Sequence, residues 1–300
     1  MNAVLARSRS RGGLMLSVLL LLGILAALSI GLNRAAGMDA QAVSSDYDSR
    51  NAAYMARAAV AAAKWMNQTT RCTSKGFSNL AFANGTLTAS IDKAGGKAIT
   101  VNASATTAAG GTASLSVKDL RVVDFSKSET KDLGGGVLDM TIDRNTATSQ
   151  NDDDKLALVS NQSHGLLFWP MADIPPDSEV LAAQLFLTQA GASATARTVT
   201  VHRVTTRWDG TATWTRARGG AAWNGGDYTA PETASAEVKG AGVYTWDMTG
   251  MVEGWTNARM QDFGVLLRLP KAGQSVSFYS KEAALSSLRP VLRVSFAKPC

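Results

Sequence analysis

A long apolar segment near the N-terminus constrains the fold of this chain more than any other feature. The run LMLSVLLLLGILAALSIGL (Leu14 to Leu32) carries no charge and directly follows the arginine-rich stretch RSRSRGG (Arg7 to Gly13). About 19 helical residues, at 1.5 Å each, are enough to cross a hydrocarbon core of about 30 Å. The arginines on one side predict that the N-terminus stays in the cytoplasm and that the chain after Asn33 is exported.

The apolar run continues into an alanine-rich stretch that ends near Asn67 and contains no proline. Apolar residues recur there at helical spacing, at Ala53, Met55, Ala59, Val60, Ala63 and Trp65. We therefore expect one helix over residues 14–67, roughly 80 Å long. A secretory signal fits less well, since its apolar part typically spans about 7–15 residues. A plain single-pass anchor remains an alternative.

Composition and cysteine content suit an exported protein. Charged residues make up 18% of the chain, and the net charge of +6 is scattered rather than clustered with aromatic residues. We therefore expect no binding to nucleic acid. The two cysteines, Cys72 and Cys300, most simply form one disulfide in an exported chain. Such a bridge would be worth roughly 4–5 kcal/mol in the chain-entropy model; two unrelated thiols are the alternative.

Residues 68–125 predict a small antiparallel sheet. Three runs alternate apolar and polar residues, at Leu87–Ile91, Ala98–Ala103 and Thr112–Val117. The sequences KAGG and TTAAGG separate them and have the composition of turns. The glycine-rich sequence DLGGG ends a predicted linker over residues 126–136.

Residues 137–300 predict an all-β domain. Short apolar runs alternate with turn residues along this region: LALVS, GLLFW, VLAAQLFL, TVTVHRV, GVYTWDM, FGVLLRL, SVSFYS and PVLRVSF. Strands at this spacing are typical of an antiparallel sandwich or jelly roll. The fold class that we expect is therefore α+β, with a long helix packed on a small antiparallel sheet and an all-β sandwich after it.

The basic leader, the apolar helix and the segment SRNAAYMARAAVAAAKWMNQ (Ser49 to Gln68) resemble type IV minor pilins and pseudopilins. The resemblance covers roughly residues 1–120. It implies cleavage by a prepilin peptidase at Gly12, Gly13 or Leu14, followed by N-methylation. Major pilins carry a glutamate at the fifth mature position, where this chain has Ser17 or Val18. The resemblance is therefore to a minor subunit.

The C-terminal region resembles a family of exported bacterial sandwich domains named for its DNRLRE sequence, some of which are alginate-type carbohydrate-binding modules. The segments that match are ADIPPDSEVLAAQLFL (Ala172 to Leu187), VHRVTTRWDGTATWTRARGGAAW (Val201 to Trp223) and YTWDMTGMVEGWTN (Tyr244 to Asn257). The chain departs from the family pattern in two places. Phe168 and Pro170 replace a basic residue and an aspartate, and Asp209 and Gly210 follow the first tryptophan where the family has a glutamate.

Trp223 and Tyr228, in the glycine-rich sequence GGAAWNGGDY, are the candidate ligand contacts, because aromatic loop residues often carry binding on a rigid sandwich. Four other tryptophans fit scaffold roles better, although a sugar-stacking platform stays open: Trp208, Trp214, Trp246 and Trp255.

We expect no metal, cofactor or catalytic residue. Asp152, Asp153 and Asp154 are adjacent rather than spaced as in a calcium loop, so they predict a solvated acidic loop. His164 and His202 have no partner at metal-ligand spacing. Asp247 and Glu253 are not expected to form a catalytic acid–base pair. Asp247 should form a turn or cap a short helix over Thr249 to Asn257, and Glu253 lies on that helix.

The two resemblances together imply a minor pilin-like subunit of a type IV filament that presents a sandwich head for adhesion or pilus assembly. Its expected partners are other pilins, the prepilin peptidase, and a tip adhesin or polysaccharide. It would reside in the inner membrane before assembly and on the cell surface afterwards. The alternative is a type II secretion pseudopilin, which would be periplasmic, or a membrane-tethered carbohydrate-binding protein.

Overall fold

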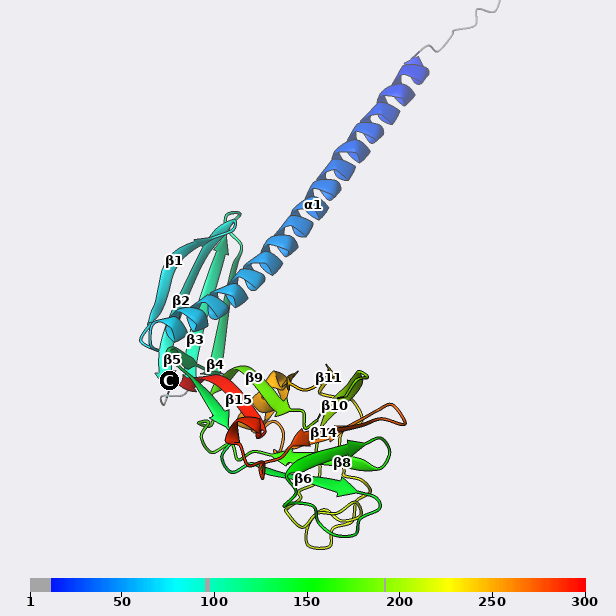
Figure 1. Cartoon of the computed structure of the whole chain (residues 1–300). Helices are drawn as coiled ribbons and strands as arrows, with labels where there is room; N and C mark the ends of the chain where they lie inside the picture. The colour runs from blue at the N-terminus through cyan, green and yellow to red at the C-terminus, as the bar shows by residue number, and fades with distance from the viewer. Residues whose placement is uncertain (1–11, 95–97, 192) are drawn as a thin grey trace, which may run out of the picture. The chain divides into compact units, whose positions relative to one another are not determined.

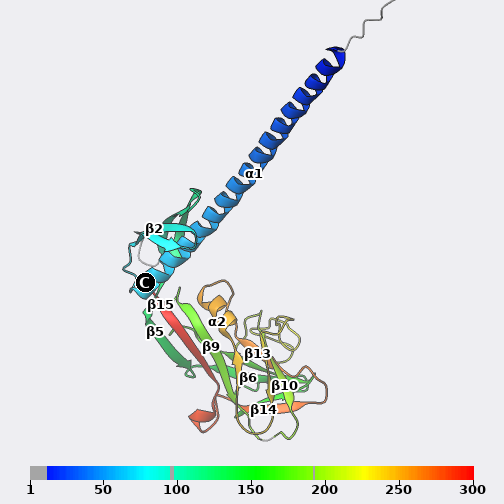
Figure 2. The same cartoon turned by 90° about the horizontal axis from the view of Figure 1, so that it is seen from above.

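The computed structural model describes residues 12–94, 98–191 and 193–300, with side chains from residue 41 onward except at 93 and 94. The chain divides into two compact units (Figures 1 and 2). One unit comprises the chain up to Ala63 with residues 75–92 and 101–117. The other comprises residues 64–74, 93–100 and 118–300.

The first unit contains most of the long helix and of a four-stranded sheet. The elements are α1 (Gly12–Thr69), β1 (Gly76–Phe82), β2 (Gly85–Ala94), β3 (Ala98–Thr107) and β4 (Thr112–Arg121). The strands follow one another in the order β1-β2-β3-β4. The three strand runs expected from the sequence lie within β2, β3 and β4, while β1 was not expected.

Small side chains allow the helix and this sheet to approach closely. The helix buries Ala52, Met55, Ala56 and Ala59, and the strands bury Leu87, Ala89, Val101, Ala103 and Ala105. A Cβ at Gly85 would lie 2.1 Å from the Thr106 carbonyl oxygen and 2.8 Å from the Met55 methyl carbon. The alanine-rich sequence therefore serves close packing over the second half of the helix.

The predicted membrane span does not fall within the residues described with side chains. Among those residues, no helix has the length and apolar character needed to span a bilayer. The side chains of residues 14–32 and the leader over 1–11 lie outside the described part. The predicted cleavage at Gly12, Gly13 or Leu14 stays a prediction.

The second unit is a β-sandwich, as the sequence predicted. Its strands are β5 (Val123–Leu133), β6 (Leu138–Asp143), β7 (Lys155–Val159), β8 (Ser163–Phe168), β9 (Glu179–Thr188), β10 (Arg197–Arg203), β11 (Ala234–Val238), β12 (Val243–Asp247), β13 (Val265–Arg268), β14 (Ser275–Tyr279) and β15 (Val291–Pro299). A short helix, α2 (Thr249–Thr256), follows β12, and a 3₁₀ turn, η1 (Ser286–Leu288), precedes β15.

Among the described residues, these strands form two antiparallel sheets. The larger sheet has the order β11-β10-β13-β8-β7-β14, with β6 pairing β8, and the smaller has the order β12-β9-β15-β5. Alternate residues of both sheets face a common core, which α2 closes at one side. The core contains Leu156, Leu167, Val199, Leu267 and Phe278 from the larger sheet, Leu185, Trp246, Leu292 and Val294 from the smaller, and Met251 and Trp255 from α2.

Residues 126–136, predicted to be a linker, belong for most of their length to strand β5. This strand pairs antiparallel with β15, with Leu292 opposite Leu133 and Arg293 opposite Asp132. Its sequence VDFSKSETKDL is polar because it lies at the edge of the sheet, where most of its side chains are exposed. The weak hydrophobic alternation concealed the strand from sequence reasoning.

The predicted disulfide is confirmed. Cys72 is bonded to Cys300, with the two Cα atoms 5.9 Å apart and 228 residues of separation along the chain. Both cysteines belong to the sandwich unit. The bridge joins the segment after α1 to the strand that ends the sandwich.

Candidate functional site

The segment between β10 and β11 folds back over the outer face of the larger sheet. We call residues 204–228 the covering segment. It shares a second apolar cluster with β6, β8 and β13. The buried members are Met140, Ile142, Leu166 and Leu266 from the strands, and Val204, Trp208, Ala212, Trp214, Ala217 and Trp223 from the segment.

The tryptophans of the covering segment help to hold it in place. Their indole nitrogens donate hydrogen bonds within the domain, from Trp208 to the Phe263 carbonyl at 2.8 Å and from Trp214 to the Asn224 side chain at 3.0 Å. Gly225 has a φ of +74°, and a Cβ there would lie 2.7 Å from the Trp214 ring. A glycine is therefore required where the segment turns against this ring.

Trp246 and Trp255 also pack inside the domain rather than on a binding surface. Both belong to the sandwich core, and the Trp246 indole nitrogen donates to the Val199 carbonyl oxygen at 3.0 Å. Its ring meets Phe278 edge-on with centroids 5.8 Å apart. The scaffold role expected for these residues is thus the one that the structure supports.

The two predicted ligand contacts lie in different environments. Trp223 is 7% exposed, and its indole nitrogen donates to the Thr213 carbonyl oxygen at 2.6 Å. Its ring belongs to the second apolar cluster. Tyr228 is half-buried, and its hydroxyl accepts a hydrogen bond from Arg268 at 2.7 Å while that guanidinium lies over its ring. A ligand contact at either residue stays a prediction.

Two half-buried phenylalanines and the buried Trp208 lie together at one end of the covering segment. A cleft of about 390 Å³, which we call the aromatic cleft, is lined by Leu138, Phe168, Arg207, Trp208, Asp209, Asp262 and Phe263. Strands β6 and β8 provide Leu138 and Phe168, and the residues just before β13 provide Asp262 and Phe263. The cleft thus combines aromatic rings with charged groups that form hydrogen bonds.

The charged groups of the aromatic cleft differ in their ionisation. Burial raises the pKa of Asp262 to about 6, although the backbone N–H of Gly264 donates to this carboxylate at 3.0 Å. The Thr211 hydroxyl and backbone N–H hold the pKa of Asp209 below its usual value. Asp262 is therefore partly protonated near pH 6 and can both donate and accept hydrogen bonds there, whereas Asp209 stays ionised.

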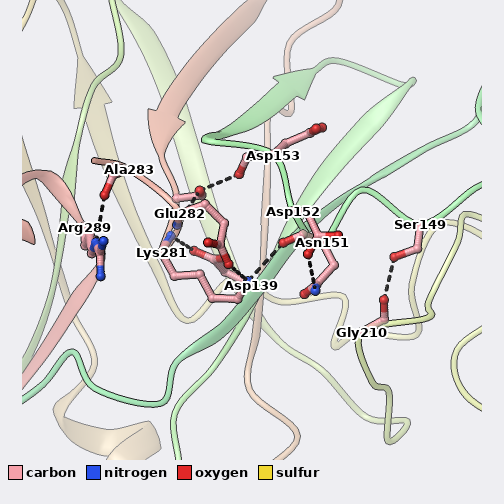
Figure 3. A network of polar contacts seen from close by, with 11 residues as sticks. Asp139, Ser149, Asn151, Asp152, Asp153, Gly210, Lys281, Glu282, Ala283 and Arg289 are labelled. Atoms are coloured by element: carbon pink, nitrogen blue, oxygen red, sulfur yellow. Dashed lines mark hydrogen bonds and ion pairs between the residues drawn. The ribbon is translucent and has the colours of Figure 1, made fainter. Parts of the chain in front are cut away.

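A polar network supports the covering segment next to the aromatic cleft (Figure 3). The Ser149 hydroxyl donates to the Gly210 carbonyl oxygen at 2.5 Å, directly after Asp209. The Lys281 ammonium donates to the Asn151 carbonyl oxygen at 3.0 Å, and the Lys281 backbone N–H donates to Asp139 at 2.7 Å. The loop before β7 thereby connects the end of β14 to the covering segment.

Asp139 is the buried carboxylate of this network. It is 0% exposed, and burial raises its pKa to about 6. Its Oδ1 atom has no hydrogen-bond partner among the described residues. The group costs stability when it is ionised, and it does not face the aromatic cleft.

The remaining sequence candidates have ordinary structural surroundings. The carboxylates of Asp152, Asp153 and Asp154 are exposed, and the loop is held by backbone carbonyls that contact Ser280. The Asp247 carboxylate accepts from the Thr249 backbone N–H at 2.9 Å, which is the predicted turn before α2. Within the described part of the chain, no three His, Cys, Asp or Glu side chains gather in a way that could hold a metal ion.

The two histidines lie beside Tyr228. His202 and His164 approach its ring edge-on, with centroid distances of 5.1 and 6.1 Å. Burial lowers the pKa of His164 to about 4 and also lowers the pKa of His202. Both rings are therefore neutral at pH 7.

Sequence reasoning missed most of the aromatic cleft. Phe168 and Asp209 had been marked by their departure from the family pattern, and both line the cleft. That departure was one available signal, and the alternative of a sugar-stacking platform, which included Trp208, was another. Arg207, Asp262 and Phe263 carried none, because their meeting depends on how the covering segment folds.

The fold is thus an antiparallel sandwich with a cleft lined by aromatic and hydrogen-bonding side chains. Residues 139–296 match the model of carbohydrate-binding module family 96, which covers more than half of the chain. The chain belongs to carbohydrate-binding module family 96. No curated protein matches it. The expected sandwich domain related to carbohydrate-binding modules is thus confirmed, and a non-catalytic module fits the expectation of a protein that is not an enzyme.

Proposed function

We propose that the protein binds a polysaccharide in the aromatic cleft. The observation that carries this proposal is the meeting of Phe168, Trp208 and Phe263 with Arg207 and two aspartates in one open cleft. Pyranose rings present apolar C–H faces that pack on aromatic rings, and their hydroxyls pair with carboxylate and guanidinium groups. Both parts of that chemistry are present in the cleft.

The proposal is tested by affinity electrophoresis of the full chain in gels containing alginate, mixed-linkage β-glucan or galactomannan. We expect retardation in at least one gel. We expect Phe263→Ala to weaken binding on the order of tenfold, which is about 1.4 kcal/mol. Lys271→Ala, at an exposed loop position, is the matched control and should bind normally. If a gel retards the Phe263→Ala variant as much as the unmodified protein, the aromatic cleft is not where the polysaccharide binds.

We further propose that α1 places this module in a type IV filament as a minor pilin-like subunit. An exposed stripe on the helix supports this. Val43, Tyr47 and Tyr54 are between 67% and 71% exposed and follow one another at spacings that share one helix face. Trp65 continues the stripe and is 62% exposed. Apolar side chains left open in this way suit packing against the helices of other subunits.

The mature N-terminus tests the filament role. We expect mass spectrometry to find a methylated terminus at Gly13 or Leu14, produced by a prepilin peptidase in the inner membrane. A terminus at Met1 or near Ala36 would contradict the filament role and leave a tethered or secreted carbohydrate-binding protein. Recovery of a processed protein in a periplasmic secretion assembly, rather than in sheared surface filaments, would favour the pseudopilin alternative.

A further inference from the structure

The outer face of the smaller sheet carries a row of polar side chains that crosses all four strands. Strands β12, β9, β15 and β5 contribute Asp247, Gln184, Arg293 and Asp132, each directly opposite the next. Each of these residues is exposed. Neighbouring strands lie about 4.8 Å apart, so the row is about 14 Å long. That length is comparable to a trisaccharide in an extended chain.

The charged members of the row are held in place before any ligand arrives. The Arg293 guanidinium donates two hydrogen bonds to Asp132, at 2.6 and 2.8 Å. The same guanidinium lies over the Phe186 ring, 5.1 Å from its centroid. The Asp247 carboxylate is fixed by the hydroxyl and backbone N–H of Thr249. Binding to groups that are already ordered costs little side-chain entropy.

Apolar surface lies beside this row on the same face. The next position along the strands places Phe186 between Thr245 of β12 and Val291 of β15. Val243, at the start of β12, is 59% exposed. Phe186 is half-buried, with the Arg293 guanidinium over one face of its ring, so this surface combines apolar area with ordered hydrogen-bonding groups.

The row ends at a groove. A groove of about 740 Å³ lies beside β11 and α2, and Asp247 lines it together with Arg203, Thr229, Glu232, Thr233 and Met251. Asp247 belongs to the polar row and also lines the groove. An extended polysaccharide that crosses the sheet along the row can therefore continue into the groove. Figure 2 shows β5, β15 and β9 side by side, with α2 next to β9.

The charge of this surface selects among polysaccharides. The Arg293–Asp132 pair is neutral as a whole, which leaves Asp247 on the row. The groove adds one cation, Arg203, and one further carboxylate, Glu232. The surface therefore has no excess positive charge to attract a polyanion, and it suits an uncharged chain.

We infer that the outer face of the smaller sheet, with the groove at its end, is a second binding surface that takes an extended uncharged polysaccharide. The inference rests on the proposed polysaccharide function and adds a surface separate from the aromatic cleft. Two surfaces on one module give avidity for a long chain that neither gives alone.

The test compares variants of each surface in the full chain, with mixed-linkage β-glucan and galactomannan as uncharged probes and alginate as the polyanion. We expect Phe186→Ala to lower affinity for an uncharged chain on the order of tenfold while Phe263→Ala in the cleft retains part of the binding. The double variant should lose more than either alone. Gln184→Ala lies at an exposed position with little structural role and should give a smaller loss of affinity. It still tests the surface if the Phe186→Ala variant fails to fold.

Lys131→Ala is the matched control on β5, since strand alternation places its side chain on the other side of the sheet from Asp132. It should bind as the unmodified protein does. If the Phe186 and Gln184 variants bind normally and the Phe263 variant does not, the second surface is refuted and the cleft stands. If the unmodified protein binds none of the probes, both proposals fail. Binding of alginate alone would overturn the choice of an uncharged chain.

Discussion

Replacing Asp139 with asparagine should make the stability of the sandwich less sensitive to pH. Asp139 is fully buried; one carboxylate oxygen accepts the Lys281 backbone N–H, and the other has no partner among the described residues. Asparagine keeps an oxygen for that N–H and carries no charge. The substitution therefore removes the ionisation of the group while nearly preserving its shape.

The size and sign of the effect follow from the pKa. Burial raises the pKa of Asp139 from 3.8 to about 6. A carboxyl group with a higher pKa in the folded state binds protons more tightly there, so its contribution to stability is lost as pH rises through this window. A shift of about two units corresponds to about 3 kcal/mol. Above pH 6 the unmodified protein carries this full cost, which the Asp139→Asn variant avoids.

The measurement is urea unfolding of the full chain, followed by tryptophan fluorescence, at several pH values between 3.5 and 8. The difference in unfolding free energy between variant and unmodified protein should increase by about 3 kcal/mol in favour of the variant over this range. Asp154→Asn, at an exposed position in the loop before β7, is the control and should give a difference that changes by less than about 0.5 kcal/mol. A flat difference for Asp139→Asn, or one that falls with pH, would refute the reasoning.

Three further predictions concern the covering segment, the disulfide and the cleft. Gly225→Ala should lower the unfolding free energy by roughly 1–3 kcal/mol, because φ is +74° and the new Cβ would meet the Trp214 ring; urea unfolding measures it. Replacing both Cys72 and Cys300 with serine should cost about 3–5 kcal/mol, and an unchanged thermal midpoint would contradict this. Polysaccharide binding should tighten as the pH falls toward about 6 and level off below that value, because a ligand that removes water from Asp262 raises its pKa further and binding then takes up a proton. Titration calorimetry should find this dependence absent in the Asp262→Asn variant.

The strands of the sandwich core were predictable because their hydrophobic pattern is local. Each of the eight apolar runs in the C-terminal region lies on an observed strand, and the short helix after Asp247 is present as α2. Strands β5, β6 and β11 of the sandwich were missed, and β5 and β11 share a reason. Both lie at sheet edges and carry polar or small side chains, so they lack the alternation that reveals a half-buried strand.

The candidate site was less predictable, because its residues meet through tertiary structure. Trp223 and Tyr228 were chosen for lying in a glycine-rich loop, yet the loop folds inward and buries the Trp223 ring. The glycines that suggested an exposed tip instead permit close packing, as Gly225 does against Trp214. Asp262 and Phe263 lie far along the chain from Trp208, and only the folded covering segment brings them to one cleft.

The covering segment links the stability of the module to its recognition surface. A stretch without regular strands or helices must bury apolar area of its own to offset the entropy lost on ordering. Three tryptophans supply that area, and one of them, Trp208, also lines the aromatic cleft. Phe168 and Phe263, which are half-buried, then complete the cleft around it. A substitution that loosens the segment should therefore weaken ligand binding even when it touches no ligand, whereas loss of Phe263 should weaken binding and leave the segment folded.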